Sequence, residues 1–231
     1  MKKSKEKLLE ITGLSNEVFE IIRFELYMFI LRLNTKFNPF KKLEINKYVN
    51  SADLKVNIGA GPFGEDGWIN IDIAKHKNIS FTYDCRKKLP FADNTVSKIR
   101  CEHLLEHLDK IYELPEFLEE CKRVLKKNGV LRIVVPDIEK YINAYYEGNW
   151  TLVGLEHNIQ AKWQAAEILT HLFRQGGEHK YGYDFHALSK VLIDAGFEKV
   201  IKTAFGCSLD GDLKYDQPNH RFHSLYVEAV K

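Results

Sequence analysis

The stretch Leu54–Asp72, LKVNIGAGPFGEDGWINID, decides the fold of this chain. Apolar residues alternate over 54–58, as on a short strand, and the glycine turn Gly59–Gly61 follows directly. A backbone without Cβ can turn tightly and lie against a ligand. Residues 69–73 then predict a second strand with Asp72 at its carboxyl end, where an acid in a parallel α/β sheet can bind the two hydroxyls of a ribose. The stretch therefore predicts a site for a cofactor that contains a nucleoside.

The spacing within this stretch indicates which nucleoside cofactor fits. GAGPFG at 59–64 matches the dinucleotide fingerprint, which needs a long helix behind the glycines and an acid about 20 residues further on. Here Gly61 lies only 11 residues before Asp72, and a proline and two more glycines interrupt the segment. A full helix does not fit between the two strands. A cofactor without a pyrophosphate is therefore favoured over NAD, and S-adenosylmethionine is the first candidate.

Length and composition describe an ordinary globular protein. The 231 residues suffice for one domain with a modest extension, and the formal net charge of +2 gives no broad footprint for nucleic acid, so no nucleic-acid partner is expected. The four cysteines show no C-x-x-C spacing and are expected to be reduced thiols of a cytosolic protein. The apolar run and cleavage site of a signal peptide do not follow MKKSKEK, so a cytoplasmic location is expected.

Residues 1–50 are expected to form a separate helical arm. Ile22, Leu26, Phe29 and Leu33 follow helical spacing, but the apolar segment is too short and too charged to span a bilayer. The arm carries ten basic and six acidic residues, a balance of +4, which leaves −2 for the remainder. We expect it to pack on the catalytic domain or on a second subunit of a homo-oligomer. The alternatives are a helix on a membrane surface, because lysines flank a wide apolar face, and an arm that docks a partner.

Residues 51–231 show the alternation of strands and helices that predicts a mostly parallel sheet. A helix is expected over 111–127, ended by KKNG at 126–129, and the last crossover helix is expected over 186–195. Residues 138–178, helical and rich in aromatic side chains, are interpreted as an inserted cap. The expected fold is α/β: a doubly wound, mostly parallel, seven-stranded sheet with this helical cap and the N-terminal arm. Its strands are expected near 54–58, 69–73, 79–83, 96–101, 129–135, 198–204 and 223–230, the last two as an antiparallel pair.

Several segments, taken in order, resemble the class I S-adenosylmethionine-dependent methyltransferases, and specifically their broad type 11 group. The resemblance covers about residues 54–230. It rests on VNIGAGP, NIDI, YDCRKKLPFADNTVSKI, EHLLEHL and LKKNGVLRIVVP. The first motif alone is a weak signal, and the ordered set is a strong one. The resemblance implies a Rossmann-like methyltransferase fold, S-adenosyl-L-methionine as the cofactor, and methyl transfer as the activity.

The same resemblance implies which residues bind the cofactor. Asp72 would bind the ribose, and Asp84 would lie at the adenine amino group with the backbone of Cys85 nearby. Asn57 stands where the family usually has an acid, so this side chain brings no charge to the cofactor's sulfonium or ammonium. The full set of cofactor-binding candidates is Asn57, Gly59, Ala60, Gly61, Asp72, Asp84, Cys85 and His103.

The candidates for activating a methyl acceptor lie in EHLLEH, Glu102–His107, where the fourth strand is expected to meet its helix. Positions 103, 106 and 107 are spaced i, i+3 and i+4, so on a helix all three side chains point the same way. Small-RNA terminal-ribose methyltransferases and ubiquinone-pathway O-methyltransferases are similar here and hold a divalent cation with E-x-x-E-H. In the RNA enzymes a later histidine completes the site, in a segment that resembles HKYGY at 179–183. This similarity implies a metal site of His103, Glu106, His107 and His179, a donor set that suits Zn²⁺, Mn²⁺ or Fe²⁺ better than Mg²⁺.

Two other accounts of these residues need no metal. In the first, His107 or His179 acts as a general base near neutral pH, His103 lines the methionine pocket, and Glu106 caps or braces the helix. In the second, the cluster is purely structural. The catalytic candidates are His107, His179 and His103. The histidines outside this cluster are expected to be satisfied surface or core residues: His171, His186, His220 and His223.

The cap and the tail 206–223 are expected to frame the acceptor pocket, and both are polar and aromatic. This composition favours a small polar acceptor, such as a sugar, nucleotide-sugar or glycan building block, over a quinone. RNA is disfavoured by the −2 balance of the catalytic region. O-methylation is favoured because a cluster that removes a proton is most useful for a hydroxyl. The alternative from another class is a non-catalytic cofactor-binding or scaffold protein on a methyltransferase fold.

Overall fold

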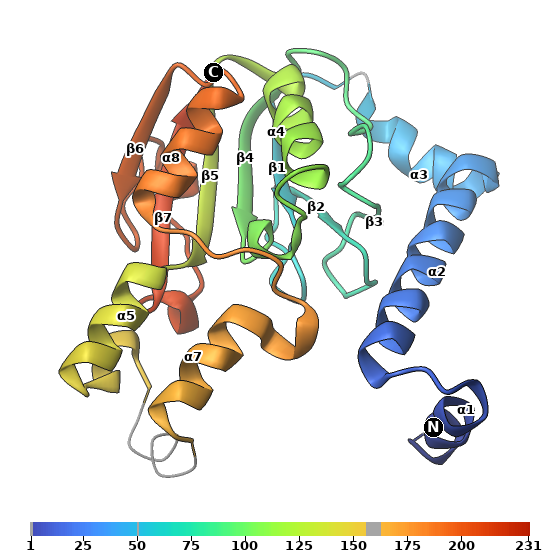
Figure 1. Ribbon diagram of the computed structural model, residues 1–231. Helices are drawn as coiled ribbons and strands as arrows, with labels where there is room; N and C mark the ends of the chain where they lie inside the picture. The colour runs from blue at the N-terminus through green and yellow to red at the C-terminus, as the bar shows by residue number, and fades with distance from the viewer. Residues whose placement is uncertain (1, 50, 156–162) are drawn as a thin grey trace.

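The computed structural model describes residues 2–49, 51–155 and 163–231, which form a seven-stranded sheet with flanking helices (Figure 1). The strand order is β3-β2-β1-β4-β5-β7-β6, in which β7 is antiparallel to β5 and β6 and the other pairs are parallel. This order confirms the expected α/β fold, including its antiparallel final pair. The strands are β1 (Leu54–Ile58), β2 (Ile69–Asp72), β3 (Phe81–Thr82), β4 (Val96–Glu102), β5 (Leu125–Pro136), β6 (Lys199–Thr203) and β7 (Ser224–Val230).

The helices lie at three places around the sheet (Figure 1). In this view α4 and α8 lie in front of it, α5 and α7 lie beyond the carboxyl ends of its parallel strands, and α1–α3 form the arm beside β3. The expected cap is thus helical in α5, a 3₁₀ turn at Trp150–Val153, and α7, while its residues 156–162 fall outside the described residues. The helices are α1 (Lys2–Thr12), α2 (Asn16–Phe37), α3 (Pro39–Val49), α4 (Glu113–Val124), α5 (Ile138–Glu147), α7 (Ala165–Arg174) and α8 (Phe185–Asp194).

The boundary between α4 and β5 corrects one expectation. KKNG at 126–129 does not end the helix, because α4 ends at Val124 and β5 already begins at Leu125. Leu125 is extended and fully buried, and it pairs with Val96 before the register shifts to the pair of Lys98 with Val130. KKNG is therefore an irregularity at the start of a strand. The basic residues and glycine that indicate a helix end are equally suited to such a bulge.

One face of the sheet carries the main hydrophobic core. Neighbouring strands align Ile58, Cys101, Ile133 and Val227 in one row, and all four side chains are fully buried. They belong to the same core as apolar residues of α4 and α8. Burial of this apolar surface is the dominant favourable contribution to the stability of the domain.

The opposite face carries a row of buried polar side chains. Asn57, Arg100, Arg132 and Glu228 pair across β1, β4, β5 and β7, and they are 3, 1, 0 and 0 % exposed. Successive side chains of a strand point to opposite faces, so this row faces away from α4 and α8. It is covered by the loop between β1 and β2 and by the tail between β6 and β7, which supply the hydrogen-bond partners of its two arginines.

Arg132 fixes the tail to the sheet through two carboxylates that are also completely buried. Its guanidinium donates two hydrogen bonds to Asp216 (2.8 and 2.7 Å) and one to Glu228 (2.8 Å). The same carboxylates accept the backbone N–H groups of Gly206 and Leu209, both at 2.8 Å. The tail that precedes β7 is therefore held by charge-assisted bonds in a region that excludes water.

The N-terminal arm packs on the domain that contains the sheet. Ile45 of α3 belongs to the main core, and the hydroxyl of Tyr27 on α2 donates to the Ile73 carbonyl just after β2 (2.5 Å). These contacts agree with the first interpretation of the arm. The outer side of α2 keeps exposed apolar residues, among them Leu26 and Phe29. None of the described helices is long and apolar enough to cross a membrane.

The buried ion network gives a stability prediction. Arg132→Met leaves two buried carboxylates without their cation, so we expect the free energy of unfolding to fall by about 3–5 kcal/mol in urea titrations. Lys126→Met is the control, because Lys126 pairs with Asp53 on the exposed surface and should cost less than about 1 kcal/mol. Equal stability of the two variants would show that the network does not hold the tail.

Candidate active site

The glycine turn lies at the carboxyl end of β1 and is tied to the end of β2. The N–H groups of residues 59 and 60 donate to the Ile71 carbonyl (2.9 and 3.1 Å), and that of Gly61 donates to the Asp72 carboxylate (2.8 Å). Gly59 and Gly61 both have positive φ, +74° and +52°, which side chains with a Cβ rarely adopt. The turn and the acid that the sequence predicts as cofactor residues are therefore adjacent.

The Asp84 carboxylate lies at the edge of the sheet and is paired with two arginines. One carboxylate oxygen accepts the backbone N–H and Nε of Arg86, and the other accepts Nε of Arg32 from the arm (2.8 Å). Burial raises the pKa of the neighbouring Cys85 to about 12, so its thiol stays neutral and its backbone remains as the polar group. The arm thus reaches the residues that the resemblance places at the adenine.

Asn57 faces the inside of the protein. Its side-chain amide donates to the Asn70 side chain (3.3 Å), which in turn accepts the N–H and donates to the carbonyl of Glu65. This chain of bonds orders the loop that follows the glycine turn. Ala60 is nearly buried within the same turn.

The segment after β4 corrects a second expectation. Leu105–His107 is a single 3₁₀ turn, and α4 begins only at Glu113, so positions 103, 106 and 107 do not share one face of an α-helix. His103 has φ +50°, and its N–H continues the ladder to the Val134 carbonyl (2.8 Å). Because of this backbone conformation, the side chains of His103 and His107 belong to two different clusters.

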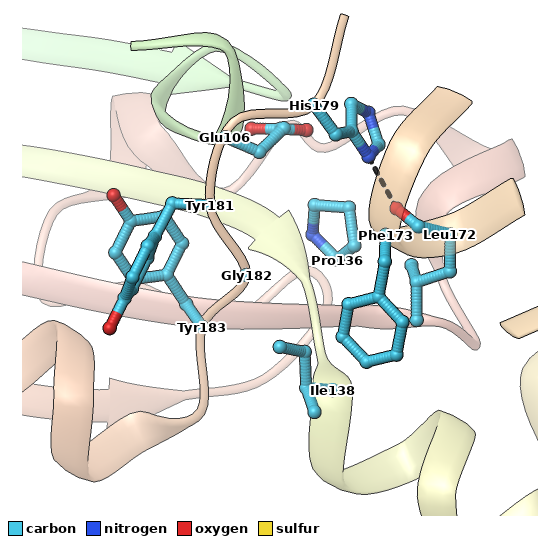
Figure 2. Close-up of a pocket in the computed structure, with 9 residues that line it drawn as sticks. All are labelled: Glu106, Pro136, Ile138, Leu172, Phe173, His179, Tyr181, Gly182 and Tyr183. Carbon is cyan, nitrogen blue, oxygen red and sulfur yellow. Dashed lines mark hydrogen bonds between the residues drawn. The ribbon is translucent and has the colours of Figure 1, made fainter. Parts of the chain in front are cut away.

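The first cluster consists of Glu106, His107 and His179, which bring one nitrogen or oxygen atom each within 4.8 Å of the others. The two imidazole rings are 4.9 Å apart at 76°. Nδ1 of His107 lies 3.2 Å from the Glu178 carbonyl, and Nδ1 of His179 lies 2.6 Å from the Leu172 carbonyl (Figure 2). A carbonyl partner fixes Nδ1 as the protonated nitrogen and leaves the Nε2 lone pair for a ligand or a proton.

Glu106 is the unusual member of this cluster. The residue is 1 % exposed, and neither carboxylate oxygen accepts a hydrogen bond from the described residues, although one lies 3.2 Å from Nδ1 of His103. Burial raises the pKa of Glu106, since water cannot solvate the charged form. It lines a cavity of about 10 Å³ together with His179 and Tyr183, whose hydroxyl also lacks a partner in the described part of the chain (Figure 2). A space of this size holds one water molecule or one ion.

The segment 179–183 is positioned by Glu106 itself. The Glu106 carbonyl accepts the N–H groups of Lys180 and Tyr181, at 2.8 and 3.3 Å. Gly182 passes so close to Ile138 that a Cβ at this position would lie 2.1 Å from its Cδ1. The residue pair predicted from sequence, Glu106 with His179, is thus brought together by backbone bonds.

The second cluster consists of His103, His220 and His223, of which the sequence analysis singled out only the first. His103 stacks on His220 at 3.8 Å and 28°, and His223 lies edge-on to both at 5.6 Å. Nε2 of His103 bonds to Ser224 Oγ (2.9 Å), and Nδ1 of His220 bonds to Glu102 (2.7 Å). One nitrogen atom of each of these three histidines also lies within 4.8 Å of the others. Imidazole lone pairs lie in the ring planes, however, so the stacked rings of His103 and His220 are poorly oriented to share one ion. This cluster is better suited to contact a ligand than to hold a metal.

A signal for the second cluster is present in the sequence. NHRFH at 219–223 directly precedes the last strand, and a strand antiparallel to β5 begins where β5 ends. His220 and His223 therefore had to lie at the carboxyl edge of the sheet, beside His103. Nδ1 of His103 also lies 3.2 Å from a Glu106 oxygen, so the two clusters are neighbours.

The second cluster gives a pH prediction. Burial, with the nearby His103 and His220, lowers the pKa of His223 to about 4, below the value of about 6.5 for a histidine in an unfolded chain. Between these values only the unfolded state binds the proton, so we expect stability to fall as pH drops from 6.5 to 4. His223→Asn should reduce the slope by up to about 1.4 kcal/mol per pH unit in urea titrations.

His186→Asn is the control for this measurement. His186 is on the exposed surface of α8 and outside the second cluster, so its replacement leaves that cluster intact. An equal slope in wild type and His223→Asn would contradict the assignment of His223 as a buried neutral group.

Comparison with known families gives one match. The model of a methyltransferase domain of the type 11 group matches residues 70–133, which run from β2 into β5 and include Asp72, Asp84, Cys85 and the segment 102–107. No curated protein matches the chain. This match and the strand order confirm the expected resemblance to class I S-adenosylmethionine-dependent methyltransferases. They support methyl transfer as the activity and S-adenosylmethionine as the cofactor.

Several solved structures are similar to the whole chain at low identity. An S-adenosylmethionine-dependent methyltransferase from Archaeoglobus fulgidus is 16% identical, with 86% of this chain and 98% of that chain covered and a TM-score of 0.48. A possible histamine N-methyltransferase from Thermotoga maritima is 17% identical, with coverages of 93% and 97% and a TM-score of 0.46. Phosphoethanolamine N-methyltransferase 2 from Haemonchus contortus, in complex with S-adenosylmethionine, is 12% identical, with coverages of 87% and 51% and a TM-score of 0.45.

Proposed function

We propose that the protein is an O-methyltransferase, which transfers the methyl group of S-adenosylmethionine to a hydroxyl of a small polar acceptor such as a sugar, nucleotide-sugar or glycan building block. The observation that carries this proposal is the buried Glu106 carboxylate, which has no hydrogen-bond partner in the described residues and faces two histidines. A hydroxyl must lose its proton as it is methylated, and groups that hold or remove protons are most useful for such an acceptor.

The cofactor side of the site follows from the turn at 59–61. The acid Asp72 would bind the ribose hydroxyls, and the glycine turn allows the backbone to approach the methionine portion. Asp84 and Cys85 would lie at the adenine, with Arg32 of the arm close by. His103, at the end of β4, would line the methionine pocket on the side of the acceptor.

The chemistry needs an in-line attack of the acceptor oxygen on the methyl carbon. The C–S bond breaks, S-adenosylhomocysteine leaves, and the hydroxyl proton is released to a base. Much of the rate comes from holding the two reactants in line. Carbonyls lie against Nδ1 of His107 and His179 and leave Nε2 of both rings free, so the cluster with Glu106 could orient the hydroxyl and accept its proton.

The donor set also fits a divalent cation. Two unprotonated imidazole nitrogens and one bare carboxylate oxygen are a common set for Zn²⁺, Mn²⁺ or Fe²⁺. The ion would be held by Glu106, His107 and His179. His103 would lie close to the ion, because its Nδ1 is 3.2 Å from a Glu106 oxygen. When bound, such an ion lowers the pKa of a coordinated hydroxyl and orients it. Without a cation, His107 would be the general base.

One prediction tests the cofactor site. Asp72→Ala removes the acid expected at the ribose, so we expect calorimetric affinity for S-adenosylmethionine to fall at least tenfold, about 1.4 kcal/mol. Asp66→Ala is the control, since Asp66 is exposed in the same loop and should leave affinity unchanged. Unchanged binding in Asp72→Ala would refute the assignment, and no binding to the wild type would favour a non-catalytic scaffold.

A further prediction tests the first cluster, which contains Glu106, His107 and His179. His107→Ala should lower turnover about 10²-fold or more while affinity for S-adenosylmethionine persists. Elemental analysis of the purified protein should find about one Zn, Mn or Fe per chain in the wild type and a loss of metal in Glu106→Gln. His171→Ala, an exposed histidine on α7, is the control and should keep both metal and activity.

The outcomes of this test separate the two forms of the mechanism. A metal-free wild type in which His107→Ala is inactive would assign His107 as the base. Normal turnover of His107→Ala would remove this residue from the chemistry. Turnover is measured as release of S-adenosylhomocysteine with a panel of sugars and nucleotide-sugars.

A further inference from the structure

A second cavity lies at the same edge of the sheet, on the side of β6. Its volume is about 420 Å³, and it opens between the start of α5, the end of β6 and the start of β7. Because β7 is antiparallel to β5, all three places are near the carboxyl end of β5. The cavity is large enough for a small polar group with several substituents, whereas the cavity beside Glu106 holds only one ion.

Three cations line this second cavity: Lys140, Lys202 and Arg221. Lys202 lies 5.8 Å from the Phe185 ring and forms one distant ion pair among the described residues, with Glu139 at 3.8 Å, and the side chains of both ion-pair partners are about half exposed. The Arg221 guanidinium lies 5.5 Å from the rings of both Phe205 and Phe222, and no ion pair of Arg221 is found among the described residues. A guanidinium held between rings keeps its N–H groups free for a bidentate anion.

Lys140 is drawn into the cavity wall. Its ammonium donates to the Ser224 carbonyl (2.6 Å), and burial lowers its pKa, with a further contribution from the nearby Lys202. The one carboxylate in the wall, Asp137, is 1 % exposed and already accepts the N–H of Glu139 as the N-cap of α5. Asp137 and Glu139 offset part of the positive charge of Lys140 and Lys202. The remaining like charges are unfavourable together unless an anion joins them.

The cavity is also next to the second histidine cluster. His223 lies between two residues that line the cavity, Phe222 and Ser224, and Ser224 Oγ bonds to Nε2 of His103. A ligand with its anion among the three cations would therefore extend over these histidines, toward the proposed methyl acceptor position.

We propose that this cavity binds a phosphate or diphosphate group of the methyl acceptor, so that the acceptor is a phosphorylated sugar or a nucleoside-diphosphate sugar. The identity of the acceptor rests on the proposed function, whereas the presence of an anion site does not. Phosphate is favoured over carboxylate because three cations around a large cavity match a group with more than one charge and several oxygens.

Isothermal titration with pyrophosphate tests the anion site directly, in the full chain and without a methyl acceptor. We expect pyrophosphate and UDP-glucose to bind, and glucose and glucuronate to bind at least tenfold more weakly. Arg221→Gln and Lys202→Gln should each weaken pyrophosphate binding, the first at least tenfold. The matched controls are Arg174→Gln and Lys214→Gln, both on the exposed surface outside the cavity, and should stay within twofold of wild type.

The results that overturn the proposal are specific. No binding of pyrophosphate to the wild type, or equal binding in Arg221→Gln and Arg174→Gln, would exclude the anion site. Glucuronate that binds as tightly as pyrophosphate would exclude phosphate as the preferred group. Affinity for S-adenosylmethionine is measured on the same samples. Variants that still bind it are folded, and a wild type that does not bind it would instead contradict the proposed function.

Discussion

The buried charge of Arg132 is the constraint on which the carboxyl edge of this protein depends. Its guanidinium, Asp216 and Glu228 are all fully buried, so each charge needs the others. This requirement fixes the tail before β7 to the polar face of the sheet. In the described residues no helix connects β1 to β2, so no crossover helix covers that face there. The same tail continues into His220, Arg221 and His223, which reach the candidate active site.

The site itself consists of three adjacent parts with different chemistry. The glycine turn and Asp72 would bind the nucleoside, the Glu106 carboxylate accepts no hydrogen bond from the described residues, and the cavity near β6 gathers cations. Groups that are unsatisfied or uncompensated in a folded protein are costly, so their concentration at one edge is typical of a binding site. The proposed methyl transfer to a small anionic acceptor would use all three parts.

Much of this site could be predicted from the sequence, because the signals are local. The glycine turn and Asp72 follow from one short motif, whereas the pairing of Glu106 with the distant His179 was predicted only from the resemblance to other methyltransferases. The shared face suggested for positions 103, 106 and 107 required a helix, which does not form there, because the backbone of His103 adopts positive φ and its N–H bonds to β5. His220 and His223 were set aside because their neighbours come from β4, more than 100 residues away. The cation cavity was missed for the same reason.

The sequence by itself determined the order of strands and helices, the glycine turn and the choice of an α/β sheet, since hydrophobic periodicity and glycine spacing act within a few residues. It also contained the alternation of Asn57, Arg100, Arg132 and Glu228 with apolar neighbours. Only the tertiary structure decided that these four form one buried polar row, that the tail covers it, and that the histidines divide into two clusters. Strand register and tail packing depend on contacts between distant segments, which no local pattern specifies.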